Sequence, residues 1–248
     1  MNIEICVDSL ESAIAAAKGG AKRVELCSAL SEGGITPSAG LIDAVRSAIN
    51  IDVFVIIRPR GGDFVYSDLE FDIMRKDIAE AKARNVNGVV LGILTSSGDI
   101  DIERTQQLVA AAKPLGVTFH RAFDECTDLD RALHDVIATG AHRILTSGGK
   151  PDAIAGIPTL TQLQKKSDGR ISIMAGGGIR ASNVQTIAQK TGVREVHTSL
   201  SKKADQFDVP TIGQNGRRSY RVLEADVRAF KTAVDALALN AETGASLR

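Results

Sequence analysis

The chain repeats the stretch GAKRVELCS (20–28) as GAHRILTSG (140–148) and again as GVREVHTSL (192–200). NVNGVVLG at 85–92 is a looser copy of the same pattern. Each copy has a glycine that suits the left-handed end of a helix, and an apolar run that suits a buried strand. The copies fall on the second, fourth, sixth and eighth predicted strands, and this alternation predicts a closed barrel built from αβ pairs.

Strand and helix patterns alternate along the rest of the chain. The apolar runs predict strands near 3–6, 23–27, 53–57, 87–91, 116–119, 142–146, 171–174 and 194–198. The amphipathic stretches predict helices near 9–19, 38–49, 68–84, 101–113, 128–139, 152–166, 181–191 and 221–238. Eight such units in 248 residues predict an α/β fold, a single (β/α)8 TIM barrel. A doubly wound open sheet is the alternative, but no GxGxxG follows the first strand.

The predicted barrel domain covers residues 1–239. One long polar loop at 200–219 follows the last strand, so we expect it to lie over the carboxyl ends of the strands. The tail at 240–248 is expected to be frayed.

Composition excludes several classes of protein. The net charge is zero, aromatic residues make up 4% and no basic block is present, so we expect no nucleic-acid partner. No apolar run reaches the roughly 18 residues that span a bilayer, so we expect no membrane partner. The odd number of cysteines, three, predicts free thiols and a reducing, cytoplasmic location.

Polar side chains gather at the carboxyl ends of the predicted strands, where barrels of this kind carry their active sites. The stretches are IEIC (3–6), VELC (24–27), RPRGGDF (58–64), FHRAFD (119–124), TSGG (146–149), MAGGGIR (174–180) and EVHTS (195–199). The opposite ends of the strands carry only Lys/Pro/Gly turns. This asymmetry predicts one functional site at the carboxyl end of the barrel.

The first two strands each carry a glutamate and a cysteine on one face, because strand side chains alternate. Glu4, Cys6, Glu25 and Cys27 should therefore point into the barrel. Thiolates on neighbouring strands favour Cu(I) or zinc, which makes Cys6 and Cys27 candidate metal ligands. Two other interpretations stay open. The thiols can be inert core packing, and the carboxylates can form a structural ion-pair network with nearby arginines.

The same end of the barrel predicts anion binding and acid–base chemistry. Glycine amides, a helix N-terminus and arginine side chains bind phosphate or carboxylate groups. The candidate anion-binding residues are Arg58, Arg60, Arg121, Ser147, Gly176, Gly177 and Gly178. The candidate general acids and bases are Glu25, His120 and Asp124.

The motifs VELC…EGGITPS, IIRPRGGDFVYS, VTFHRAFD, RILTSGG and IMAGGGIR together resemble the CutC family of copper homeostasis proteins. The resemblance runs from the first strand to about Arg218. It implies a TIM barrel, a cytoplasmic location and Cu(I) bound by two cysteines, which match Cys6 and Cys27 here.

The preferred hypothesis is therefore a cytoplasmic protein of copper homeostasis that binds Cu(I). The alternatives are a barrel enzyme acting on a small phosphorylated or carboxylated metabolite, and a non-catalytic structural or interaction protein. Whether the chain catalyses a reaction stays open at this point. The expected partners are a copper ion or a small anionic ligand, and a homo-oligomer (dimer or tetramer) is expected.

Overall fold

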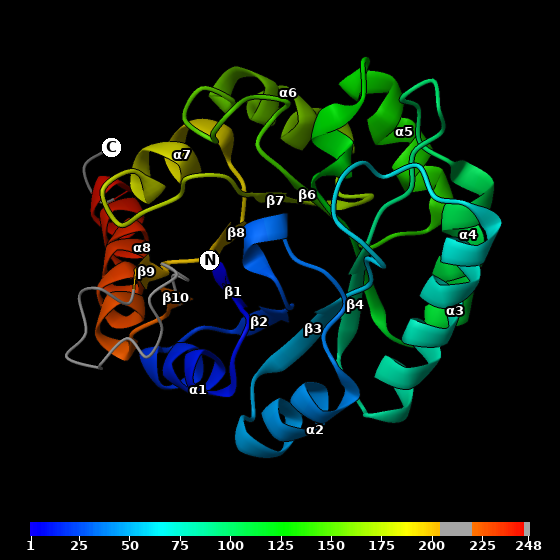
Figure 1. Cartoon of the computed structure of the whole chain (residues 1–248). Coiled ribbons are helices and arrows are strands. Elements are labelled where there is room, and N and C mark those ends of the chain that lie inside the picture. Colours follow the sequence, from blue (N-terminus) through cyan, green and yellow to red (C-terminus); the bar gives the residue numbers. More distant parts are fainter. Residues whose placement is uncertain (204–219, 246–248) are drawn as a thin grey trace.

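The computed structural model describes residues 1–203 and 220–245, and its centre is a closed barrel of eight parallel strands (Figure 1). Neighbouring strands pair in sequence order, and the eighth pairs with the first. The strands are β1 (Asn2–Val7), β2 (Arg23–Leu26), β3 (Asp52–Ile56), β4 (Gly88–Leu91), β5 (Gly116–Phe119), β6 (Arg143–Thr146), β7 (Ser172–Ala175) and β8 (Glu195–Thr198). The predicted TIM barrel is confirmed, and the open sheet is excluded.

Helices surround the strands as an outer ring (Figure 1). They are α1 (Leu10–Gly19), α2 (Ala39–Ala48), α3 (Asp68–Ala83), α4 (Ile102–Ala112), α5 (Leu129–Thr139), α6 (Ile157–Ser167), α7 (Val184–Thr191) and α8 (Glu224–Ala245). The short helices η1 (Leu30–Glu32) and η2 (Arg121–Glu125) follow β2 and β5, and β9 (Lys202–Lys203) pairs with β10 (Tyr220–Arg221). Most of the predicted loop at 200–219 lies outside the described residues, from 204 onward.

Helix α6 begins later than the predicted 152–166. The Asp152 carboxylate accepts a hydrogen bond from the Ala155 amide at 2.8 Å, which favours a turn over a helix. Gly156 then packs so closely that a Cβ there would lie 1.8 Å from the Ser147 carbonyl oxygen. The helix starts only after this contact, at Ile157, with Pro158 in its first turn.

Helix α8 runs past the predicted end at 238 and reaches Ala245, within the stretch expected to be a frayed tail. Its alanines, leucine and glutamate are good helix formers, which explains the extension. Residues 246–248 of the predicted tail lie outside the described part of the chain. Neither α8 nor any other helix in residues 1–203 and 220–245 is long and apolar enough to cross a bilayer.

The alternation of β1 and β2 is as predicted. The outward-facing residues pack in the main hydrophobic core between barrel and helices; they are Ile3, Ile5, Val24 and Leu26. The inward-facing residues are buried inside the barrel; they are Glu4, Cys6, Arg23 and Glu25. This arrangement places carboxylates, a thiol and a guanidinium in one enclosed space.

An ion-pair network closes the amino-terminal half of the barrel interior. It consists of Glu4, Arg23, Phe54, Arg143 and Glu195, here called the floor cluster. Arg23 donates to Glu4 and to Glu195, the latter at 2.7 Å, and Arg143 donates to Glu195 at 2.8 Å. The two guanidinium groups lie 4.9 and 5.4 Å from the centre of the Phe54 ring, in cation–π contact. Both carboxylates of the floor cluster, Glu4 and Glu195, therefore have a cationic partner.

Candidate functional site

A cavity of about 580 Å³ opens above the floor cluster at the carboxyl ends of the strands. Its volume falls in the range typical of small-molecule sites. Its lining combines apolar and polar side chains from all strands but β4; they include Cys6, Glu25, Leu30, Ile56, Arg58, Phe64, His120, Arg121, Asp124, Leu145, Lys150, Gly177, Gly178, Arg180, His197 and Ser199. The predicted position of the site is therefore where the structure has its cavity.

Cys6 is the central residue of a thiol cluster at the bottom of the cavity. The Sγ atoms of Cys6 and Cys27 are 3.7 Å apart, and Cys6 Sγ is 3.6 Å from Glu25 Oε1. The strand register places Cys6 directly beside Glu25, and Cys27 follows the end of β2. Cys27 is fully buried, whereas Cys6 lines the cavity. We call Cys6, Cys27, Glu25 and His197 the thiol cluster.

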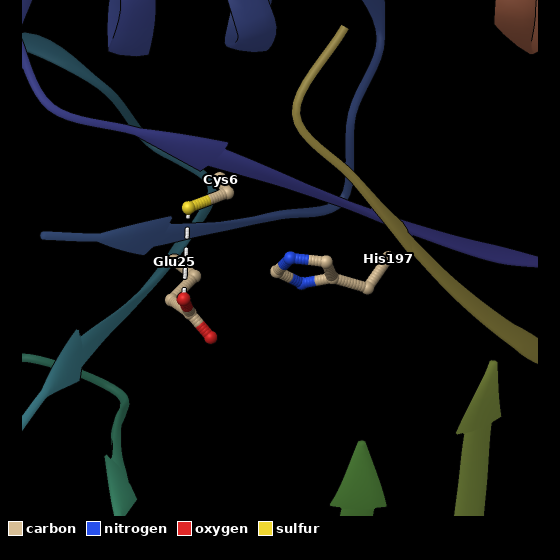
Figure 2. Close-up of side chains that lie close together, drawn as sticks. All are labelled: Cys6, Glu25 and His197. Atoms are coloured by element: carbon tan, nitrogen blue, oxygen red, sulfur yellow. Dashed lines mark hydrogen bonds between the residues drawn. The ribbon is translucent and has the colours of Figure 1, made fainter. Parts of the chain in front are cut away.

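His197 completes the thiol cluster from β8. Figure 2 shows its ring directed toward Cys6 and Glu25. Its Nδ1 lies 2.7 Å from Glu4 Oε1, and β8 and β1 are paired at these two residues. Because the Glu4 carboxylate is ionised, Nδ1 is the donor in this bond, and the ring is held with Nε2 toward the cluster.

The buried charges set the protonation states of the cluster. Burial alone would raise the pKa of Glu4, but the hydrogen bond from His197 and the charge of Arg23 outweigh it and lower that pKa to about 2. Burial alone would lower the pKa of His197, but contacts with Cys6 and with the two carboxylates raise it well above its ordinary value. An ionised Glu4 in the floor cluster thus lies against the imidazolium of His197 in the thiol cluster.

The thiol of Cys6 is protonated in this environment. Its hydrogen bond with Cys27, followed by burial, raises its pKa well above the ordinary value. Burial likewise raises the pKa of the Glu25 carboxyl. A ligand that needs a thiolate must therefore displace the Cys6 proton.

Three side chains of the cluster can act as a set of metal ligands. One donor atom from each of Cys6, Glu25 and His197 lies within 4.8 Å of the other two. Thiolate and imidazole donors suit copper and zinc. Cys27 adds a second sulfur through its contact with Cys6.

His120 lies at the cavity wall and is 5% exposed. Its Nδ1 accepts a hydrogen bond from the Ala122 amide at 3.2 Å, so Nε2 carries the ring proton. Within the described residues Nε2 has no partner. Burial, aided by the charge of Arg58, lowers the His120 pKa to about 3, so the ring is neutral.

Arg58 lines the cavity, but most of its donors bind the protein itself. Its Nη atoms donate to the carbonyl oxygens of Glu32, Gly34 and Gly62 at 2.6, 3.0 and 2.7 Å. These bonds join the loops after β2 and β3. Only Nε lacks a partner among the described residues. The predicted anion-binding role of Arg58 is therefore reduced to one donor.

Arg60 is not among the residues that line the cavity. It forms ion pairs with Asp63 at 3.1 Å and with Glu70 at 2.6 Å, and its side chain is 36% exposed. The predicted role of Arg60 in anion binding therefore receives no support from its position. The reason is that its guanidinium is held by the loop before α3, next to Tyr66.

Arg60→Ala is expected to lower the free energy of unfolding by only about 1 kcal/mol, because exposed ion pairs contribute little. Urea denaturation at neutral pH measures this change. A loss near 3 kcal/mol would show that Arg60 holds the loop more strongly than its exposure suggests.

Asp124 organises the loop after β6. Its carboxylate accepts hydrogen bonds from Arg121, from the Thr146 hydroxyl and from the Ser147 and Gly149 amides. Both oxygens are thus engaged, which favours a positioning role over the predicted acid–base role. Ser147 donates to the Lys150 carbonyl and accepts from Arg121 at 2.9 Å, and it does not line the cavity.

The glycine loop after β7 has the predicted position but divides into two parts. Gly176 donates to the Thr146 carbonyl at 2.9 Å, and a Cβ there would lie 2.5 Å from Leu145 Cδ1, so it is a packing residue. Gly177 and Gly178 line the cavity with φ angles of 95° and 67°. Residues with a side chain rarely adopt these φ angles, which explains why both positions are glycine.

Sequence reasoning did not single out Arg23 and left His197 off its list of candidate site residues. Arg23 has the same strand parity as Glu25, and His197 the same parity as Glu195. The alternation of strand side chains therefore indicated that both residues point into the barrel. The sequence left open an ion-pair network between the carboxylates of Glu4 and Glu25 and nearby arginines, and for Glu4 the partners are Arg23 and His197.

Comparisons with known proteins give consistent matches over most of the chain. The family model described as "CutC family" matches residues 1–202. The human "copper homeostasis protein cutC homolog" is 48% identical over 203 residues, covering 82% of this chain and 74% of its own length. A "family protein CutC" from Vibrio cholerae is 52% identical over 199 residues, covering 79% of this chain and 78% of its own.

A solved structure is similar over most of its length. The crystal structure of a copper homeostasis protein CutC from Streptococcus agalactiae is 40% identical, with a TM-score of 0.77. The match covers 80% of this chain and 98% of that one.

Proposed function

The chain belongs to the CutC family, and on that premise we propose that it takes part in copper homeostasis by binding Cu(I) at the thiol cluster. The observation that carries the proposal is the 3.7 Å separation of two free thiols, one of which lines the cavity. Thiolates are the donors that Cu(I) prefers, and a reducing cytoplasm keeps both the thiols and Cu(I) in the required state.

The spacing of the sulfurs suits a single shared ion. With metal–sulfur bonds of about 2.3 Å, two sulfurs 3.7 Å apart subtend roughly 107° at the ion. A bent pair of sulfurs leaves coordination positions open on the side of the cavity. The proposed site is therefore more than a linear two-sulfur site.

His197 is the proposed third donor. Its Nε2 faces the cluster, and its Nδ1 is held by the Glu4 carboxylate. A carboxylate bound to the far nitrogen is the usual support of a metal-binding imidazole. Glu25 is a harder oxygen donor, so its proposed role is to receive the Cys6 proton and to release it to solvent through the cavity, which Glu25 lines.

The interpretation of the cysteines as inert packing accounts for Cys27 better than for Cys6. Cys27 is enclosed by apolar neighbours such as Ile56 and Val90. Cys6 instead contacts a carboxylate and lies close to an imidazole. A polar environment of this kind has no packing advantage, which favours a binding role.

A Cu(I) titration under anaerobic, reducing conditions tests the proposal, with a colorimetric Cu(I) chelator as the competitor. We expect one ion per chain, with sulfur and nitrogen scatterers in the copper X-ray absorption spectrum. A chain that removes no Cu(I) from the chelator would contradict the proposal.

The apparent affinity for Cu(I) should fall as pH falls from about 8 to 6. Binding displaces the Cys6 proton and, if His197 is a ligand, its Nε2 proton as well, because both pKa values are raised. Each displaced proton costs about tenfold in affinity per pH unit. We therefore expect the affinity for Cu(I) to fall at least tenfold for each pH unit. In His197→Gln the pH dependence should correspond to about one displaced proton fewer. Competition titration at several pH values measures both. A flat profile would contradict thiolate binding at Cys6.

A further inference from the structure

One wall of the cavity has chemistry that the thiol cluster does not use. It is formed by the loops after β5, β6, β7 and β8. Among the described residues, the amide N–H groups of Gly177 and Gly178 donate to no protein acceptor. Consecutive amides in a left-handed turn form a concave site that attracts anions.

The charged side chains that line this wall are mainly positive, and Asp152, which lies against Gly178, accepts a hydrogen bond from the Ala155 amide. Arg121, Lys150 and Arg180 all line the cavity and are exposed toward solvent. Asp124 lines it too, but its carboxylate is engaged with Arg121 and the loop after β6. Glu125 is the other carboxylate on this wall. The balance favours a negatively charged ligand.

Two buried donors on the cavity wall lack an acceptor. They are His120 Nε2 and Arg58 Nε, and both residues are 5% exposed. A buried donor without a partner costs free energy, so such groups are normally satisfied by water or by a ligand. These donors are independent of the glycine loop and come from different strands.

We propose that this wall binds a small phosphate monoester. Its phosphate oxygens accept hydrogen bonds from the Gly177 and Gly178 amides and from the Ser199 hydroxyl. A second oxygen of the ligand, on a hydroxyl or carbonyl group, accepts from His120 Nε2. The apolar side chains of Phe64 and Leu145 enclose the carbon skeleton.

The donors suit a phosphate better than a carboxylate. Two amides, one hydroxyl and the Arg180 guanidinium would fill all of the about four acceptor sites of a carboxylate, whereas a phosphate can engage them with acceptor sites left over. A phosphate monoester offers three terminal oxygens and close to two negative charges. This ligand class deepens the alternative of a barrel that acts on phosphorylated metabolites, and it does not depend on copper binding.

The closing experiment measures glycerol 3-phosphate by isothermal titration calorimetry, with glycerol and glycolate as ligands that lack the phosphate. Ser199→Asp places a carboxylate beside the phosphate and should weaken binding at least tenfold. Ser199→Asn is the neutral variant of similar size; it also loses the hydroxyl donor, so it should weaken binding, but at least threefold less than Ser199→Asp does. Asp at Gly177 is a poorer test, because its φ of 95° strains any side chain.

His120→Asn tests the second contact. The Asn Oδ1 can still accept from the Ala122 amide, while the Nε2 donor of the imidazole is lost. We expect at least a fivefold weaker affinity for glycerol 3-phosphate and a smaller change for inorganic phosphate. Arg180→Ala, at an exposed position, should weaken both ligands and serves if Ser199→Asp does not fold.

The outcomes separate this site from the copper site. Cys6→Ser with Cys27→Ser should bind glycerol 3-phosphate like the parent, and Ser199→Asp should bind Cu(I) like the parent. The proposal is overturned if glycerol 3-phosphate does not bind at about 10 mM, far above the Kd of a specific site. It is also overturned if glycolate binds in its place, or if Ser199→Asp and Arg180→Ala both bind as the parent does.

Discussion

Cys6→Ser combined with Cys27→Ser is expected to weaken Cu(I) binding by more than about 100-fold and to leave the barrel folded. Even the loss of an outer partner of a metal ligand typically costs 10- to 100-fold in affinity, and here both sulfurs are removed. The serine hydroxyl is smaller and remains protonated, so it cannot replace a thiolate. Competition titration against a Cu(I) chelator measures the loss, and circular dichroism follows the fold.

The third cysteine supplies the matched control. Cys126 lies outside the barrel interior, where its Sγ is 3.8 Å from the Ala122 carbonyl oxygen. Burial, followed by the charges of Asp99 and other nearby carboxylates, raises its pKa to about 12, so it is a poor thiolate. Cys126→Ser should bind Cu(I) like the parent. Parent-like affinity in the double variant would instead remove Cys6 and Cys27 from the ligand set.

The single variants should differ from each other. Cys6 contacts both Cys27 and Glu25, and it groups with His197, whereas Cys27 is in contact only with Cys6 among these. Loss of Cys6 therefore separates the remaining donors, while loss of Cys27 leaves a Cys–His–Glu set. We expect the weaker Cu(I) binding from Cys6→Ser.

The inward direction of Glu4, Cys6 and Glu25 could be predicted from sequence because it depends on a local rule. Strand side chains alternate, and apolar neighbours at Ile3, Ile5 and Val24 needed the helix-covered outer face. The same local reasoning placed the glycine loop at the carboxyl end of β7. These predictions required no knowledge of which strands become neighbours at closure.

The partners of these residues could not be predicted in the same way. Glu4 and His197 are 193 positions apart in sequence, and only the pairing of β8 with β1 brings them together. The position of the Arg60 side chain could not be predicted for a related reason. It follows the end of β3, where alternation no longer applies, and the loop turns its guanidinium toward Glu70 instead of the cavity.

The floor cluster has a consequence for the thiol cluster above it. The hydrogen bond from His197 and the charge of Arg23 together keep Glu4 ionised, and the ionised Glu4 holds His197 with Nε2 toward Cys6. The orientation of the proposed third ligand therefore depends on a guanidinium at the other end of the barrel interior. A change in Arg23 should affect both stability and Cu(I) binding.

Arg23→Met is expected to lower the free energy of unfolding by about 3–5 kcal/mol at neutral pH. Arg23 is 5% exposed and donates to two buried carboxylates, so its removal leaves Glu4 with only His197. Removing one partner of a buried ion pair typically has a cost of this size. Urea denaturation measures the loss, and Arg60→Ala provides the comparison with an exposed arginine. Arg23→Met with Glu4→Gln should recover part of the stability, because no unpaired carboxylate then remains at Glu4.

The pH dependence of this loss identifies its cause. In the parent, the folded-state pKa of Glu4 is about 2 against an ordinary 4.5, so its contribution to stability is complete above 4.5 and disappears as pH falls toward 2. In Arg23→Met the pKa of Glu4 rises, and the folded state can take up a proton that relieves the unpaired charge. The difference between parent and variant should therefore be largest near neutral pH and should shrink below about pH 4.5. A loss that stays constant from pH 7 to pH 4 would contradict the electrostatic explanation and would instead indicate that Arg23 stabilises the barrel by packing against Phe54.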